Sequence, residues 1–132
     1  MLNRLFCLVP LLLVTLNISH AGDATSGEKI FSKCRPCHQV GETARNSVGP
    51  VLNGLFGRKS GTQEGYNYSE ANKSSGITWD ESTFTIYIRD PKARIPGTKM
   101  TFAGLKSDDE IKDIIAYLKQ FDQAGKITTG SR

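Results

Sequence analysis

The sequence predicts an all-α fold in one small domain of a 132-residue chain. Residues 78–81 and 107–110 both match the pattern of a helix-capping box, and apolar residues at helical spacing follow each of them. The third observation is that no strand pattern flanks the closely spaced pair Cys34 and Cys37. We therefore expect a monomeric domain of helices joined by loops.

The first 21 residues have the layout of a secretory signal peptide. Arg4 supplies a positive charge, residues 5–16 are almost wholly apolar, and residues 19–21 end in a small residue. The apolar run is shorter than the about 20 residues that cross a bilayer, although an uncleaved membrane anchor remains the alternative. Cleavage after Ala21 would leave a domain of residues 22–132, exported to the bacterial periplasm.

The charge balance of this domain does not favour nucleic acid as a partner. The chain has 17 Lys and Arg residues against 13 Asp and Glu residues, and loss of Arg4 leaves 16 against 13. Such a small excess still allows a local basic face, which matters more for encounter with a partner than the total.

A short helix over residues 28–33 is expected to lead into Cys34-Arg35-Pro36-Cys37-His38, with capping residues among 23–26. The Cys-x-x-Cys-His run is the attachment signature of a c-type haem. Thiols three residues apart fall on the same side of one helical turn. Both thiols can therefore add to the vinyl groups along one porphyrin edge, while His38 offers an imidazole nitrogen to the iron.

Three other readings of this motif are weaker. A zinc site usually needs four Cys or His ligands, and the domain keeps only Cys34, Cys37 and His38 once Cys7 and His20 leave with the signal. A structural disulfide would leave His38 unexplained. A thioredoxin-like pair is expected beside a βαβ pattern, which the flanking sequence does not show.

Residues 39–76 read as a long loop, because glycines and Pro50 interrupt every apolar pattern. One helical turn is expected near residues 69–73. A loop of this length in so small a domain needs something to organise it. A haem would serve, since it is a large rigid apolar disc around which loops can fold.

The second half of the chain holds the clearest helices. The capping box at 78–81 opens a segment that stops before Pro91, with Phe84, Tyr87 and Ile88 as its apolar stripe. A strand is the alternative there because β-branched residues are frequent. Residues 91–103 are expected to be irregular.

The most secure helix follows the capping box at 107–110. Its apolar face is formed by Ile111, Ile114, Ile115, Leu118 and Phe121. After Ala124 the tail is polar, and we expect it to be frayed.

Several motifs in this order resemble the class I cytochromes c, in particular the short mitochondrial-like and bacterial type. They are residues 27–31, 34–38, 49–50, 53–58, 76–79, 95–100 and 116–118, together with Tyr68 and Asn72. The resemblance covers nearly all of residues 22–132. It implies a small cytochrome c fold, in which N- and C-terminal helices pack together and loops surround one covalently bound haem.

The resemblance assigns thioether links to Cys34 and Cys37 and axial iron ligation to His38 and Met100. Counting residues supports Met100, because it is the only methionine left once Met1 is removed. The alternative for a lone methionine is gap-filling in the core, but Met100 lies in a Gly/Pro loop. These two axial ligands would leave no open iron position, and the soft thioether sulfur would favour the reduced ion.

The resemblance also implies the surroundings of the haem. The Pro50 carbonyl would accept a hydrogen bond from the His38 ring, and Phe102 would close the haem pocket. The inner propionate would be held by Arg58, Tyr68 and Trp79. A polar network behind Met100 would consist of Asn72, Tyr87 and Thr98. For Arg58 the alternative is a solvated surface charge, and for Tyr87 it is simple helix packing.

The expected function is that of a soluble one-electron carrier between a quinol-oxidising bc1-type complex and a terminal acceptor such as cytochrome c oxidase. Partners would meet a lysine-rich haem edge formed by Lys33, Lys92, Lys99 and Lys106, unless these are ordinary solvated lysines. Two residues depart from the mitochondrial type. Arg94 stands where that type usually has an aromatic residue, and Ser107 leaves the basic face with one lysine fewer. The N-terminal helix also looks one residue shorter.

The competing function is a haem-based enzyme or gas-binding sensor with an open iron position. The sensor-type cytochromes carry their haem motif near the C-terminus and lack a methionine ligand, whereas Cys34 lies early and Met100 is present. The chain shows no Ser/His/Asp set and, after cleavage, no second histidine. We therefore expect no enzyme activity and no small-molecule substrate.

Overall fold

The computed structural model describes residues 21–128. Within them the chain forms five helices: α1 (Ala24–Phe31), α2 (Glu70–Lys73), α3 (Glu81–Arg89), α4 (Pro91–Arg94) and α5 (Asp108–Leu118). The only β pairing in the described part consists of two isolated bridges, Lys59–Thr78 and Phe121–Ile127. The all-α prediction is therefore confirmed. The signal segment expected at 1–21 lies, apart from Ala21, outside the described residues.

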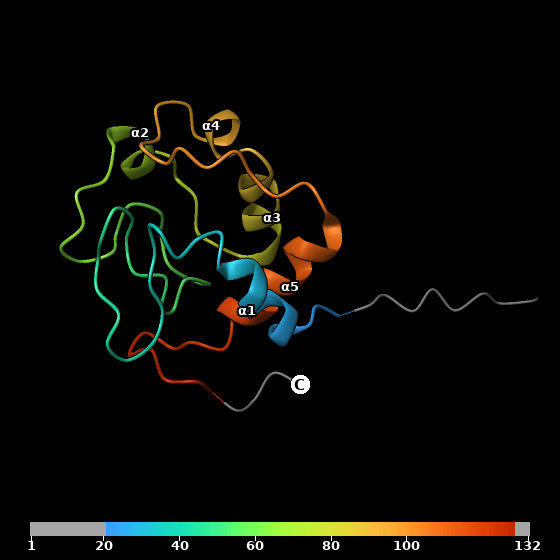
Figure 1. The fold of residues 1–132 in the computed structure, drawn as a ribbon. Helices are drawn as coiled ribbons and strands as arrows, with labels where there is room; N and C mark the ends of the chain where they lie inside the picture. The colour runs from blue at the N-terminus through green and yellow to red at the C-terminus, as the bar shows by residue number, and fades with distance from the viewer. Residues whose placement is uncertain (1–20, 129–132) are drawn as a thin grey trace, which may run out of the picture.

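The fold is built on the crossing of α1 and α5, which lie against each other at the centre of Figure 1. Gly27 makes the close approach possible, because a Cβ there would lie 2.0 Å from the Asp113 carbonyl oxygen. Next to this contact the rings of Phe31 and Tyr117 meet with centroids 5.3 Å apart. The expected packing of the N-terminal helix on the C-terminal helix is confirmed.

The helix α1 begins earlier in the chain than residues 28–33. Asp23 caps it, and its carboxylate accepts from the N–H groups of Thr25 and Ser26. The regular helix ends at Phe31, and the chain then continues in tight turns through His38, including a bond from the His38 N–H to the Cys34 carbonyl (2.9 Å). The motif at 34–38 thus begins where α1 ends.

The helix expected after the capping box at 78–81 is present as α3, and the strand alternative is wrong. The cap itself is Asp80, not Thr78, and it forms a capping box with Thr83. The helix ends at Arg89, as expected from Pro91. That proline then begins α4, one further helical turn capped by Asp90 in a stretch expected to be irregular.

The helix α5 begins as expected, with the Ser107 hydroxyl accepting from the Glu110 N–H, and ends at Leu118. Its apolar face is buried as predicted. The expected turn at 69–73 is α2, capped by Ser69.

The expectation of a frayed tail after Ala124 is wrong up to residue 128. Residues 120–128 turn back on themselves and are here called the C-terminal hairpin. The Asp122 N–H donates to the Lys126 carbonyl (3.0 Å) and the Thr128 N–H to the Gln120 carbonyl (2.9 Å). Local backbone pairing and the turn at Gly125 (φ 79°) close this hairpin.

Residues 39–69 form a long loop on the left-hand side of Figure 1, and its Phe56 packs against Phe84 of α3 with ring centroids 5.6 Å apart. This loop and the segment that follows α4 leave a cavity between them and the faces of α3 and α5. Among the described residues, no helix has the length and apolar character needed to cross a membrane.

Candidate cofactor site

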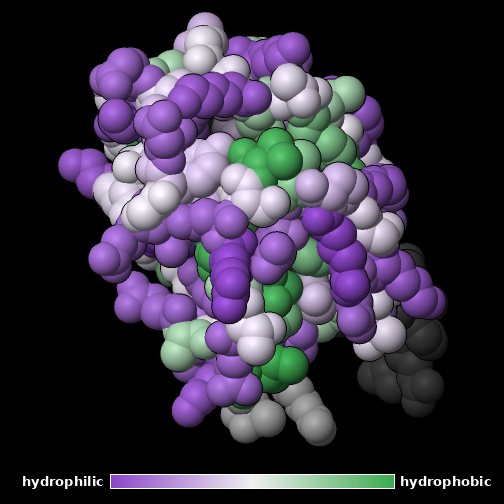
Figure 2. All heavy atoms as spheres, turned by 60° about the vertical axis from the view of Figure 1, so that its left-hand side comes forward, coloured by the Kyte–Doolittle hydropathy of each residue, from purple (hydrophilic) through white to green (hydrophobic). Residues whose placement is uncertain are grey.

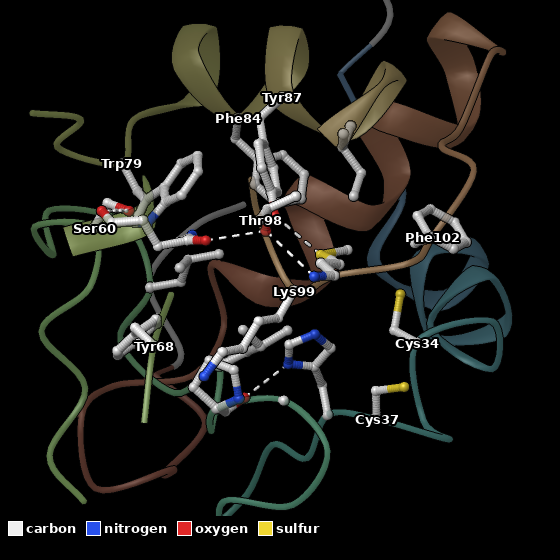
Figure 3. A pocket seen from close by; sticks show the side chains of 18 of the residues that line it. Cys34, Cys37, Ser60, Tyr68, Trp79, Phe84, Tyr87, Thr98, Lys99 and Phe102 are labelled. Carbon is white, nitrogen blue, oxygen red and sulfur yellow. Dashed lines mark hydrogen bonds between the residues drawn. The ribbon is translucent and has the colours of Figure 1, made fainter. Parts of the chain in front are cut away.

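A cavity of about 390 Å³ collects nearly every residue that the sequence singled out. This volume falls in the range of about 300–1,000 Å³ usual for small-molecule and cofactor pockets. In Figure 3, Phe84 and Tyr87 descend from α3 on one side of the cavity, Cys37 lies on the far side, and Trp79 and Tyr68 lie on a third. Much of the remaining lining is apolar: Leu52, Leu55, Ile88, Ile114, Leu118 and Phe102.

The thiols of Cys34 and Cys37 line this cavity together with His38. Neither thiol is in a disulfide. Burial, and next the neighbouring Cys37, raise the pKa of Cys34 to about 11, so its neutral thiol is the stable form near pH 7. Because neither thiol is in a disulfide, the disulfide alternative is not borne out by the structure.

The His38 ring is fixed from behind by the backbone. Its Nδ1 lies 2.8 Å from the Pro50 carbonyl oxygen, to which it donates, leaving Nε2 free to bind a metal. A Cβ on Gly49 would lie 2.3 Å from the imidazole Cε1, so only glycine allows this approach. Burial lowers the pKa of His38, which favours the neutral imidazole that a metal requires. The expected Pro50 contact is confirmed.

The sulfur of Met100 is held on the Tyr87 side of the same cavity. The Tyr87 hydroxyl donates to Met100 Sδ at 3.0 Å. The Thr98 hydroxyl accepts from the Met100 N–H (3.3 Å) and donates to Asn72 Oδ1 (3.0 Å). The expected network of Asn72, Tyr87 and Thr98 is present, and Tyr87 is also packed in the core, so both readings of Tyr87 hold.

Arg58, Tyr68 and Trp79 meet at one wall of the cavity. The Arg58 guanidinium is half-buried and donates to the carbonyls of Val51 and Asn53 and to Gln63 Oε1, the last at 2.6 Å. Burial lowers the pKa of Arg58. Arg58 is thus an anchored cation, and the solvated-charge alternative is wrong. Gln63, which the sequence did not reveal, positions it.

The four lysines of the expected haem edge differ in their surroundings. Lys33 and Lys99 line the cavity, but Lys33 pairs with Glu110 at 2.8 Å and Lys99 donates to the Asn67 carbonyl at 3.0 Å. Lys106 donates to the Arg89 carbonyl at the end of α3, and Lys92 is exposed on α4. Figure 2 shows a face dominated by hydrophilic side chains, with hydrophobic ones visible between them.

The donor set fits a haem better than a bare metal ion. Within residues 21–128, no group of three or more His, Cys, Asp or Glu side chains could hold a metal ion. The cavity instead combines a large apolar lining with two thiols, one imidazole, one thioether and one anchored guanidinium. Those are the groups needed to attach a porphyrin, ligate its iron and bind a carboxylate.

Sequence reasoning did not assign a role at this site to three residues that support it, although Asn53 lies in the 53–58 motif and Glu110 in the capping box. Gln63 accepts from Arg58, and Glu110 pairs with Lys33. The buried Asn53 amide donates to the Gly41 carbonyl and accepts from the Gly41 N–H. Each contact joins positions whose spacing follows no local pattern. The one available signal was Asn53, a polar residue between apolar neighbours.

Comparison with known proteins shows the family of this chain. The family described as "Cytochrome c" matches residues 24–122. The chain is 63% identical to cytochrome c2 of Blastochloris viridis over 105 residues, 80% of this chain and 83% of the relative. It is 58% identical to cytochrome c-550 of Nitrobacter winogradskyi over 106 residues, 80% of this chain and 97% of the relative.

A solved structure gives the same result for the fold. The cytochrome cH from Methylobacterium extorquens superposes with a TM-score of 0.71 at 46% identity, covering 75% of this chain and 99% of that one. The similarity of fold and sequence and the Cys-x-x-Cys-His motif that faces the cavity lead to the same family. The chain belongs to the cytochrome c family and is a cytochrome c2-type electron carrier, not an enzyme, whose motif at 34–38 attaches haem c covalently.

Proposed function

We propose that this protein is an exported one-electron carrier with a closed iron site. Cys34 and Cys37 would form the thioether links to one haem, and His38 and Met100 would be the axial ligands. The observation that carries the proposal is the placement of Met100, whose sulfur faces the same cavity as the motif and is held by Tyr87 at 3.0 Å.

The chain's own residues explain why such a site would transfer electrons and do little else. A haem iron changes charge by one electron, and imidazole with thioether ligation favours its reduced state. His38 is already oriented by Pro50, so little rearrangement is needed between the two charge states. The apolar lining would keep water away from a bound haem, and with His38 and Met100 both ligating its iron no substrate or dioxygen would have a place to bind.

Export would bring the protein to its site of action. The proposed signal peptide is 1–21 and the proposed mature domain is 22–132, which would be soluble in the bacterial periplasm. The match to the cytochrome c family begins at residue 24 and leaves the apolar segment outside it. Mass spectrometry of the exported protein should give a chain that starts at Gly22 and carries one haem.

Its partners would be redox proteins, as for other cytochromes of this type. We propose a quinol-oxidising bc1-type complex as donor and a terminal oxidase or other reductase as acceptor, met as a monomer through the edge near Lys33 and Lys99. Both lysines line the mouth of the cavity. Nucleic acid and small-molecule substrates have no role in this proposal.

The near-infrared spectrum tests the ligand set. The oxidised protein should show the weak band of sulfur-to-iron charge transfer at neutral pH, and Met100→Ala should abolish it. Thr101→Ala, at the exposed neighbouring position, is the matched control and should keep the band. A wild-type protein without the band, or one that binds carbon monoxide readily when reduced, would favour the open-iron enzyme or sensor.

A further inference from the structure

Two short segments lie against each other beside the His38 imidazole, residues 37–41 and residues 49–53, here called the clasp. Five hydrogen bonds join them. Three lie nearest the imidazole: Gly49 N–H to the Cys37 carbonyl (2.8 Å), His38 Nδ1 to the Pro50 carbonyl (2.8 Å) and Leu52 N–H to the Gln39 carbonyl (3.1 Å). The orientation of the imidazole therefore depends on whether the clasp stays closed.

Asn53 closes the far end of the clasp. Its Nδ2 donates to the Gly41 carbonyl (2.9 Å), and its Oδ1 accepts from the Gly41 N–H (2.8 Å). The side chain is buried, with only 7% of its surface exposed. Buried polar groups of this kind are costly if their partners move away. Water that reached this end would compete for both bonds and would loosen the clasp.

The C-terminal hairpin covers this end of the clasp. Gly125 is buried, and a Cβ there would lie 2.1 Å from the Gly41 carbonyl oxygen and 2.7 Å from Asn53 Nδ2. Beside it, the Gly54 N–H donates to the Phe121 carbonyl (3.1 Å). Gly125 thus seals the Gly41–Asn53 pair by direct contact.

We propose that the C-terminal hairpin is a positioning element for His38. By excluding water from Gly41 and Asn53 it keeps the clasp closed, and the closed clasp holds the imidazole against Pro50. Asn53 extends the effect to Arg58, whose guanidinium donates to the Asn53 carbonyl (3.3 Å). The inference rests on the proposed role of His38 as an iron ligand.

Gly125→Ala in the haem-loaded protein tests this role, with Gly76→Ala as the matched control. Both glycines have positive φ, 79° and 70°, so alanine is strained at each. A Cβ at Gly76 meets no atom within 4 Å, whereas one at Gly125 collides with the clasp. Hydrogen exchange of the Gly41 amide and the His38 ring N–H should be about tenfold faster in Gly125→Ala than in Gly76→Ala, as expected for a local opening.

The near-infrared methionine band separates this local effect from general destabilisation. We expect the band to persist in Gly125→Ala, because Met100 is held by α3 and not by the clasp. Equal exchange rates in the two variants, or loss of the band together with His38 protection, would overturn the inference. Absence of the band from the wild type would instead overturn the proposed function.

A second variant avoids the added methyl group. Deletion of residues 126–132 removes the hairpin's return strand and its bonds to Asp122 and Gln120. The deletion should speed hydrogen exchange of the Gly41 amide and the His38 ring N–H. Unchanged exchange rates would refute the positioning role. If Gly125→Ala yields no folded protein, this deletion alone decides.

Discussion

The Tyr87 hydroxyl donates a hydrogen bond to the Met100 sulfur at 3.0 Å. Tyr87 is buried on α3, and this burial raises its pKa to about 12. The hydroxyl therefore remains protonated over the physiological range and can only donate to the sulfur. A donor withdraws electron density from the thioether, and this should stabilise the reduced state of an iron bound to it.

Replacing Tyr87 by phenylalanine should lower the reduction potential. The sulfur would regain electron density and favour the oxidised iron. A hydrogen bond with a net value of about 0.5–1.5 kcal/mol corresponds to about 20–60 mV for one electron. A spectroelectrochemical titration measures this shift. Tyr117→Phe is the control, because Tyr117 is buried on α5 outside the cavity lining; a rise in potential, or an equal fall in both variants, would contradict the prediction.

Gly27→Ala should destabilise the fold even though alanine is the better helix former. Its Cβ would lie 2.0 Å from the Asp113 carbonyl oxygen and 2.7 Å from Tyr117 Cβ, so α1 and α5 would have to separate. Overpacking of this kind costs about 1–3 kcal/mol, which guanidinium unfolding would detect. Lys29→Ala, at an exposed position of the same helix, should change the free energy of unfolding little. Equal effects in both variants would mean that the crossing is not tightly packed.

The helices could be predicted where their signals are local. Helical spacing and a cap identify α5, and Pro91 marks the end of α3. The early start of α1 was missed because Gly27 lowers helix propensity, and its presence is explained only by α5 packed against it. The C-terminal hairpin was also missed, because its polar sequence gives no helical or strand pattern, and its contact with Gly41 joins residues far apart in the chain.

The residues of the site likewise fall into those that the sequence reveals and those that it does not. Cys34, Cys37, His38 and Met100 stand out in the sequence because residues 22–132 contain no other Cys, His or Met, and the structure brings them to one cavity. The partners of the charged residues were not predictable. Pairing of Lys33 with Glu110 joins positions 77 apart in the chain, and no spacing rule connects them.

That pairing leads to a prediction about encounter with partners. Lys33 lines the mouth of the cavity, and Glu110 neutralises it locally at 2.8 Å. Glu110→Gln would free this positive charge. Reaction of the reduced protein with ferricyanide, an anionic oxidant, should become faster than in the wild type and should fall more steeply with salt. Stopped-flow rates across a salt series provide the measurement.

Glu81→Gln makes the control for this experiment. Glu81 pairs with Lys119 away from the cavity, so the variant has the same net charge but an unchanged cavity mouth. We expect its ferricyanide rate to rise less than that of Glu110→Gln. Matching rates and salt slopes would show that only total charge counts and that the edge near Lys33 is not the site of electron exit.

Asp80 gives the stability of the fold a defined dependence on acid pH. The carboxylate caps α3 and accepts from the Thr83 N–H (2.7 Å). These bonds to Thr83 lower the pKa of Asp80 below its ordinary value of 3.8. Because the folded pKa is the lower one, the unfolded chain binds a proton first as pH falls. The contribution of the charged cap is therefore complete above the unfolded pKa and is lost as pH falls through the folded pKa.

Urea unfolding of the wild type and Asp80→Asn across a pH series tests this sign. Asparagine keeps a capping oxygen but carries no charge, so the difference in unfolding free energy between the two proteins should be constant from about pH 5 to 7. Below 3.8, the ordinary pKa of the Asp80 carboxyl, the wild type should lose stability more steeply and the difference should shrink. Glu42→Gln, at an exposed loop position, supplies the comparison for a carboxylate outside any helix. A difference that grew on acidification would mean that the charged Asp80 opposes the helix.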